Sequence, residues 1–133
     1  MTTFVDTSAF YAILSASDSN HGAAATLWTS LIRDQAHLIT SNYVVAEACA
    51  LLQNRLGTAA VASLVSDILP VVTVRWVDPA AHDQALTALC RGTRSGPSLV
   101  DRTSFEIARA AGVDTVFAFD QHFAAEGFTV LGI

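Results

Sequence analysis

The chain of 133 residues is 52% hydrophobic and only 14% charged, with a formal net charge of −5. This balance excludes a disordered polypeptide, which requires low hydrophobicity and high charge. The length fits one domain of ordinary size, so we expect residues 1–133 to form a single domain. All seven basic residues are arginines, which excludes Schiff-base chemistry and the Walker A phosphate loop. No GxGxxG or GxSxG motif occurs, which argues against dinucleotide binding and against an esterase nucleophile.

The sequence also bears on the compartment. No apolar run approaches the ~18 residues of a membrane span, and no basic stretch precedes an apolar one at the N-terminus, so we predict no secretory signal. Cys49 and Cys90 lie in apolar helical patterns without CxxC or Cys/His spacing. We interpret them as buried thiols in a reducing compartment and expect a cytoplasmic protein.

Short β-type runs alternate with longer helical patterns along the whole chain. Strands are predicted at 3–5, 37–40, 71–77, 115–119 and 129–131, and helices at 7–16, 21–33, 42–56, 58–68, 79–90, 99–111 and 121–125. This alternation is typical of an α/β protein in which a central parallel sheet of four or five strands is covered by helices on both faces, in three α/β/α layers. In such folds, sites gather where strands end and helices begin.

Four acidic residues stand out by their positions. Asp6 and Asp120 each follow a predicted strand and precede a helix, so either could be a helix N-cap. Asp101 lies three residues after Ser98, and the pair resembles a capping box. Glu47 lies in the middle of a predicted helix among apolar neighbours, with no arginine three or four residues away. A buried, unpaired carboxylate is costly, so we expect another group to compensate Glu47.

Capping and metal binding are compatible roles for these acids. If the fold brings Asp6, Glu47, Asp101 and Asp120 together, each pair at about 6 Å and an effective dielectric of about 20 repels by about 2.8 kcal/mol. Such a cluster must take up protons or a divalent cation. Ligands that are oxygen atoms alone favour Mg²⁺ or Mn²⁺, whereas zinc prefers His or Cys. Without these four acids, eight acids remain against seven arginines, so the predicted site carries most of the negative charge.

Three arginines, Arg91, Arg94 and Arg102, lie close to Asp101 in the sequence. Guanidinium groups bind phosphates through paired hydrogen bonds, and a carboxylate metal site beside them is typical of phosphodiester hydrolysis. Equally, Arg91 and Arg94 could simply complement a helix C-terminus.

The four histidines share no ligand spacing, and we interpret them as structural or surface residues: His21, His37, His82 and His122. His122 follows Asp120 closely enough to approach a phosphate, but an ordinary first-turn helix residue is the interpretation we favour.

Four segments, in this order and spacing, resemble PIN domains, most closely the VapC-type toxins of bacterial toxin–antitoxin pairs. They are FVDTSA (4–9), SNYVVAE (41–47), SLVDRTSF (98–105) and FAFDQHF (117–123), and the resemblance covers nearly the whole chain. It implies a Mg²⁺- or Mn²⁺-dependent endoribonuclease that cuts structured RNA such as tRNA or rRNA. It also implies inhibition by a protein antitoxin and pairing as a homodimer.

The family pattern assigns roles to individual residues. The metal-coordinating acids would be Asp6, Glu47, Asp101 and Asp120, with Thr7 and Ser8 as polar support beside the first. One departure is Val100, where a threonine is common in relatives.

Two other functions remain open on the sequence. In one, the acids only cap helices and the chain is a catalytically silent binding module for an arginine-bearing peptide. In the other, it is a different Mg²⁺-dependent phosphohydrolase that acts on a small phosphate ester.

Overall fold

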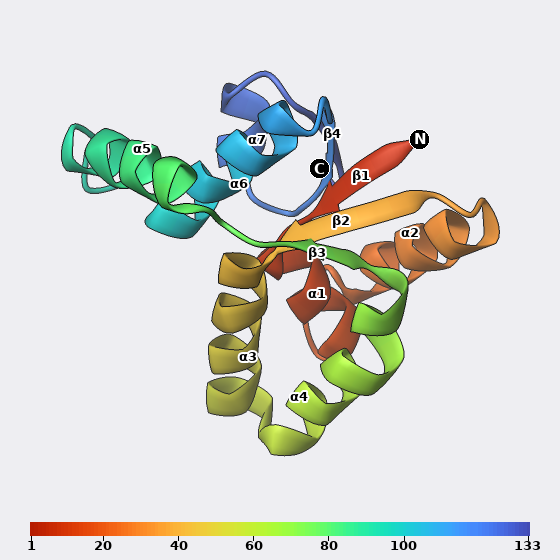
Figure 1. Ribbon diagram of the computed structural model, residues 1–133. Coiled ribbons are helices and arrows are strands. Elements are labelled where there is room, and N and C mark those ends of the chain that lie inside the picture. Colours follow the sequence, from red (N-terminus) through yellow and green to blue (C-terminus); the bar gives the residue numbers. More distant parts are fainter.

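Five parallel strands lie side by side at the centre of the computed structural model, which describes residues 1–133 (Figure 1). Their order across the sheet is β3-β2-β1-β4-β5. They are β1 (Thr2–Val5), β2 (His37–Ser41), β3 (Thr73–Arg75), β4 (Thr115–Phe117) and β5 (Thr129–Leu131). The predicted parallel sheet of four or five strands is therefore confirmed.

Helices cover both faces of this sheet. In Figure 1, α5, α6 and α7 lie on one face, and α1, α2, α3 and α4 lie on the other. The helices are α1 (Thr7–Leu14), α2 (His21–Arg33), α3 (Asn42–Leu56), α4 (Thr58–Ser63), α5 (Pro79–Cys90), α6 (Leu99–Ala110) and α7 (His122–Ala125); a π-helical turn, η1 (Leu64–Ile68), and a 3₁₀ turn, η2 (Leu69–Val71), follow α4. This arrangement confirms the three-layer α/β/α architecture.

The largest departure from the predicted elements lies between α4 and β3. The helix predicted at 58–68 changes to π-helical hydrogen bonding after Ser63, and the strand predicted at 71–77 begins only at Thr73. Pro70 lies in the 3₁₀ turn before that strand. Because proline has no backbone N–H to give to a sheet, the chain turns there before it extends.

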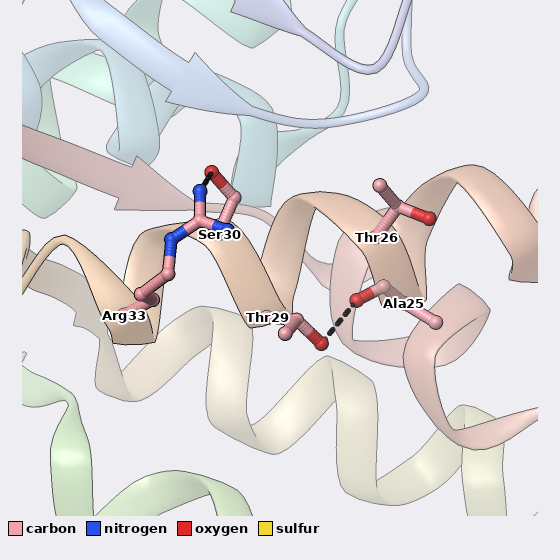
Figure 2. A pocket seen from close by; sticks show the side chains of 5 residues that line it. All are labelled: Ala25, Thr26, Thr29, Ser30 and Arg33. Carbon is pink, nitrogen blue, oxygen red and sulfur yellow. Dashed lines mark hydrogen bonds between the residues drawn. The ribbon is translucent and has the colours of Figure 1, made fainter.

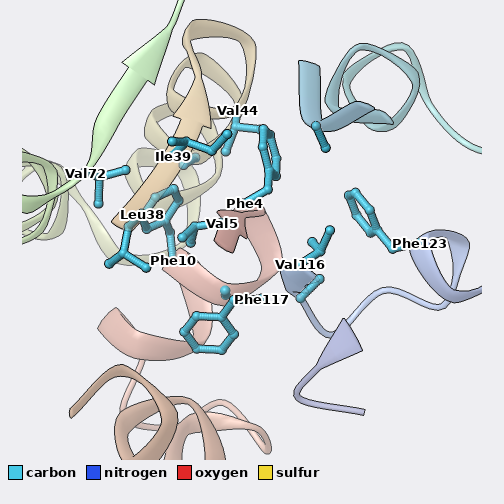
Figure 3. Packing of buried hydrophobic residues seen from close by; sticks show 14 of the residues in the cluster. Phe4, Val5, Phe10, Leu38, Ile39, Val44, Val72, Val116, Phe117 and Phe123 are labelled. Atoms are coloured by element: carbon cyan, nitrogen blue, oxygen red, sulfur yellow. The ribbon is translucent and has the colours of Figure 1, made fainter. Parts of the chain in front are cut away.

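The central strand β1 is buried on both faces. Phe4 is in register with Ile39 and Val116 on one face, and Val5 is in register with Phe117. All five side chains are fully buried, and Figure 3 shows them in the core between the helical layers. Because both faces of β1 are packed, the residue that follows it is held in a defined position.

An aromatic cluster fixes α6 against α7. The ring of Phe105 packs edge-on against Phe123, with centroids 5.2 Å apart, and stacks on Phe128 at 5.9 Å. These contacts set the position of the two helices that carry Asp101 and His122.

The order in which the chain adds strands to the sheet reverses between β1 and β4. From β1 it winds outward to β2 and β3, and then crosses to β4 and β5. The backbone N–H of Asp6, just past β1, donates to the carbonyl of Phe117 at the end of β4 (3.0 Å). Ligand sites of open parallel sheets lie at such a reversal, outside the carboxyl ends of the strands.

No helix here combines the length and the apolar character needed to cross a bilayer. Neither cysteine forms a disulfide. Cys49 is partly buried, but Cys90, at the end of α5, is exposed. The interpretation as two buried thiols is therefore wrong for Cys90, which lies on the solvent side of its helix.

The core predicts a specific cost of mutation. Phe4→Ala should lower the free energy of unfolding by about 3–5 kcal/mol, because it leaves a cavity in the fully packed central strand. Urea unfolding monitored by circular dichroism measures this. Trp76→Ala, at a side chain that is 76% exposed, serves as the control and should change stability little. Equal effects of the two substitutions would contradict this description of the core.

Candidate metal centre

Asp6 lies at the end of β1 with its side chain only 3% exposed. It is the N-cap of α1, as predicted, because its Oδ2 accepts from the backbone N–H of Ser8 (3.1 Å) and from the Ser8 hydroxyl (2.6 Å). The hydroxyl oxygen in turn accepts from the N–H of Phe119 (2.9 Å). Ser8 thus joins the carboxylate after β1 to the segment after β4.

Asp101 is held by the predicted capping box at the start of α6. Its Oδ2 accepts from the N–H of Ser98 (3.0 Å), and its own N–H donates to the Ser98 hydroxyl (3.1 Å). The residue is buried, with 7% exposed. The hydrogen bonds that begin the helix therefore also fix one carboxylate oxygen.

Asp120 follows β4, where its Oδ1 accepts from the backbone N–H of His122 (2.8 Å). It is thus bound to the first turn of α7, although Gln121 is the N-cap of that helix.

His122 is the site residue that the sequence reasoning missed. Its Nδ1 lies 3.1 Å from Asp120 Oδ1 and 3.4 Å from Asp101 Oδ2. Neither contact has the alignment of a hydrogen bond, so we treat both as charge contacts. The interpretation of His122 as an ordinary first-turn residue is wrong, since its ring points at two acids. The available signal was its place two residues after Asp120, at a strand end.

Burial and charge shift the proton affinities of the site. Burial raises the pKa of Asp6 to about 7, and the charges of Asp101 and Asp120 add to the rise. The hydrogen bonds from Ser8 lower this pKa but do not offset the effect of burial. Burial, followed by the charge of Asp120, also raises the pKa of Asp101. Partial burial of the His122 ring lowers its pKa. The charge of Asp120, with smaller effects from the Ser95 carbonyl and from Asp101, outweighs this, so the pKa of His122 is raised overall.

These groups fit a divalent cation. Asp6 Oδ1 is buried with no hydrogen-bond partner, which is costly unless a cation or a proton satisfies it. One ligand atom each from Asp101, Asp120 and His122 lies within 4.8 Å of the other two. The set contains an imidazole nitrogen as well as carboxylate oxygens, so the expectation of oxygen ligands alone stays a prediction. Carboxylates suit Mg²⁺ and Mn²⁺, and the nitrogen suits transition metals.

Glu47 and Thr7 lie outside this hydrogen-bonded set. Glu47 is partly exposed on α3 and makes no hydrogen bond or ion pair, so the premise that it is buried among apolar residues is wrong. Its carboxylate is not one of the three mutually close ligand groups. The Thr7 hydroxyl is buried without a partner. Their roles as metal ligand and polar support stay predictions.

The three arginines differ in their surroundings. Arg91 and Arg94 are exposed on the loop between α5 and α6 and form no ion pair. Arg102 is partly buried, and its Nε donates to the carbonyl of Pro97 (3.1 Å).

The largest surface hollow, of about 450 Å³, lies elsewhere, along α2. Figure 2 shows its polar side chains: the Thr29 hydroxyl donates to the carbonyl of Ala25 (2.8 Å), and Arg33 donates to the Ser30 hydroxyl (3.3 Å). These groups satisfy one another within one helix. The hollow offers no carboxylate, and the acids at the strand ends remain the candidate site.

Comparisons with known proteins agree with this geometry. The PIN domain family model matches residues 3–128. The chain is 40% identical over 126 residues to the 23S rRNA-specific endonuclease VapC20 of Mycobacterium tuberculosis, in two strains, and the match covers 94% of each chain.

Solved structures show the same relationship. The crystal structure of Mycobacterium tuberculosis VapC20, described as a sarcin–ricin loop cleaving toxin, matches with a TM-score of 0.85 and 36% identity over 97% of both chains. FitAcB from Neisseria gonorrhoeae matches with a TM-score of 0.68 over 98% of this chain and 96% of that one. Its 21% identity establishes likeness of fold alone.

The raised pKa of Asp6 predicts how stability depends on pH. The folded-state pKa of Asp6, about 7, lies above the ordinary pKa of an aspartate, 3.8, so folding stability falls as pH rises between these two values. From about pH 5.5 to about pH 8.5, in EDTA, wild type should lose about 2 kcal/mol relative to Asp6→Asn. Urea unfolding at both pH values measures this.

The exposed Asp83 supplies the control, because Asp83→Asn should show no such pH-dependent difference. If Asp6→Asn and wild type change in parallel with pH, Asp6 does not hold a proton in the folded state.

Proposed function

This chain belongs to the PIN-domain family, and we propose that it is a VapC-type endoribonuclease toxin that hydrolyses RNA phosphodiester bonds with a bound divalent metal ion. The observation that carries this is the convergence of Asp6, Asp101, Asp120 and His122 at the carboxyl ends of β1 and β4. The 40% identity to a 23S rRNA-specific endonuclease over 94% of both chains supports the reaction class.

The metal-holding residues would be Asp6, Asp101, Asp120 and Glu47, with the His122 ring beside them. We propose Mg²⁺ or Mn²⁺, because carboxylate oxygens predominate among the donors. When bound, such an ion supplies an activated water at neutral pH and balances the charge that develops on the phosphate.

The chain's own residues prepare this site before any substrate binds. Ser8 holds Asp6 by two hydrogen bonds and accepts a third from Phe119, so the ends of β1 and β4 keep a fixed spacing. Ser98 fixes Asp101 by two hydrogen bonds, one to its carboxylate and one from its backbone N–H. Fixed donor oxygens need little reorganisation during the reaction, which lowers its barrier. Thr7, buried beside Asp6, would add polar support.

The proposed substrate is a structured RNA, specifically the sarcin–ricin loop of 23S rRNA. The basis is the specificity stated for the related VapC20 protein. Arg91 and Arg94 would contact RNA phosphates, since both are exposed and free of acidic partners. Arg102 was predicted to share this role, but its Nε is used by Pro97. We also propose a cytoplasmic location, because the proposed substrate is ribosomal RNA.

A protein antitoxin and a second copy of the chain are the proposed protein partners. Large apolar side chains are exposed, including Trp76 (76%), Val65 (55%) and Val71 (52%). Partners that cover them would remove apolar surface from water, which favours association. Size-exclusion chromatography with light scattering tests the dimer.

Cleavage of a labelled RNA hairpin with the sarcin–ricin sequence tests the reaction. Wild type should cut it with Mg²⁺ or Mn²⁺ and stop in EDTA. Asp101→Asn, which can still accept from Ser98, should lower the rate by at least about a hundred-fold, more than is typical of a residue that only supports a ligand. Cutting that survives this substitution would identify a contaminant. No cutting, or turnover of a small phosphate ester instead, would favour the binding-module or phosphohydrolase alternative.

Glu47→Gln separates a metal ligand from a surface acid. If Glu47 is a ligand, RNA cleavage should fall by about a hundred-fold or more while stability stays within about 0.5 kcal/mol, because the side chain makes no hydrogen bond in the fold. Glu126→Gln, which removes an acid paired with Arg109 outside the site, serves as the control. Cleavage within about two-fold of wild type in Glu47→Gln would remove Glu47 from the ligand set.

A further inference from the structure

The loop between α5 and α6, residues 91–98, is shaped from inside by Arg102. The Nε of Arg102 donates to the carbonyl of Pro97 (3.1 Å). A Cβ on Gly92 would lie 2.5 Å from a terminal nitrogen of Arg102, and one on Gly96 would lie 3.5 Å from it. The guanidinium group therefore lies against both glycines, where a side chain on Gly92 would displace it.

His122 connects the same loop to the acids of the candidate metal centre. Its Nε2 lies 3.2 Å from the carbonyl oxygen of Ser95. Because a carbonyl oxygen can only accept, Nε2 carries the hydrogen and donates it. The other ring nitrogen faces Asp101 and Asp120 at 3.4 and 3.1 Å. One imidazole ring therefore joins the loop to two of the acids, in the pattern of a histidine that a backbone carbonyl orients towards a cation.

The loop carries the two exposed arginines of this region. Arg94 directly precedes Ser95, whose carbonyl is bound, and Arg91 lies at the end of α5. Neither forms an ion pair. A guanidinium on a loop already ordered beside the acids loses less conformational entropy when it binds a phosphate than one on a free loop.

We propose that His122 is a positioning residue that holds loop 91–98 beside the metal centre, so that Arg94 and Arg91 bind the RNA phosphates that flank the bond to be cut. This rests on the proposed ribonuclease function and names the element that grips the substrate strand. Arg102 is then a structural part of the loop.

A double-mutant cycle on RNA binding tests the coupling. Binding of the fluorescent sarcin–ricin hairpin is measured by anisotropy in Mn²⁺, in the Asp6→Asn background, which keeps the RNA intact. Arg94→Gln should weaken binding about ten-fold, the effect of one lost charge-assisted hydrogen bond. The substitution His122→Phe keeps an aromatic ring but removes both nitrogens. In a protein that also carries it, Arg94→Gln should weaken RNA binding by about two-fold or less. An equal factor in both backgrounds would overturn the proposal.

Hydrogen exchange tests the loop without RNA. The Gly96 amide donates to the Thr93 carbonyl (3.0 Å) inside the loop, and it should exchange faster in His122→Phe than in wild type. Unchanged exchange at Gly96 would also overturn the proposal. His37→Phe, which changes a histidine at the opposite end of the sheet, should leave this amide as in wild type.

Arg33→Gln removes one exposed arginine from α2 and is the matched control for charge. It should leave RNA binding within about two-fold. Failure of the ribonuclease proposal has a separate signature, because wild type would then not cut the hairpin with any metal. The loop proposal alone would be wrong if wild type cuts the hairpin normally and the effects of Arg94→Gln and His122→Phe on RNA binding are independent.

Discussion

The burial of one carboxylate, that of Asp6, organises the rest of the molecule. Its β-strand is packed on both faces, so the side chain at the strand's end lies where two acids from other elements also converge. One oxygen is satisfied by Ser8 and the other has no partner. Desolvation of a charged group on this scale is unfavourable unless a proton or a cation compensates it. This unfavourable desolvation free energy occurs at the position where a bound cation would be useful for chemistry.

Helix capping and metal binding are one arrangement here. Free N–H groups at the starts of α1 and α6 attract carboxylates whatever the protein does. In this chain, the N-cap Asp6 and the capping-box residue Asp101 each use one oxygen, Oδ2, in the hydrogen bonds that begin their helix. Capping thus fixes each carboxyl group while leaving its other oxygen outside the helix hydrogen bonds. A capping role is therefore no evidence against a role as a metal ligand when several capping carboxylates lie at the same edge of a parallel sheet.

Most elements could be predicted from sequence because they carry local signals: β-type runs in the strands, and N-cap residues before several helices. The parallel arrangement of the strands, but not their order in the sheet, could be predicted from their alternation with helices. The strand after Pro70 was predicted to start two residues too early, at Val71, because Val71 and Val72 continue an apolar run, whereas the 3₁₀ turn that contains Pro70 extends to Val71. Glu47 was misjudged because helical spacing describes neighbours on the same helix and says nothing of open solvent beside it. His122 was missed because one of its two acidic neighbours, Asp101, comes from α6, twenty-one residues earlier. Only tertiary packing, such as that of Phe105 on Phe123, brings the two residues together.

The charge distribution explains how an acidic chain can select RNA. With a net charge of −5, long-range attraction to phosphate is weak, so binding must come from a local concentration of positive charge. The carboxylates alone would repel a phosphate, whereas each divalent ion offsets two of their charges and turns the same position attractive. In the proposed binding mode, Arg91 and Arg94 would act beside that position, since neither has an acidic partner to neutralise it. Affinity then depends on two elements that must be adjacent, the metal centre and the loop. His122 contacts both, so under our proposal it would determine whether the metal centre and the arginines attract the same RNA strand.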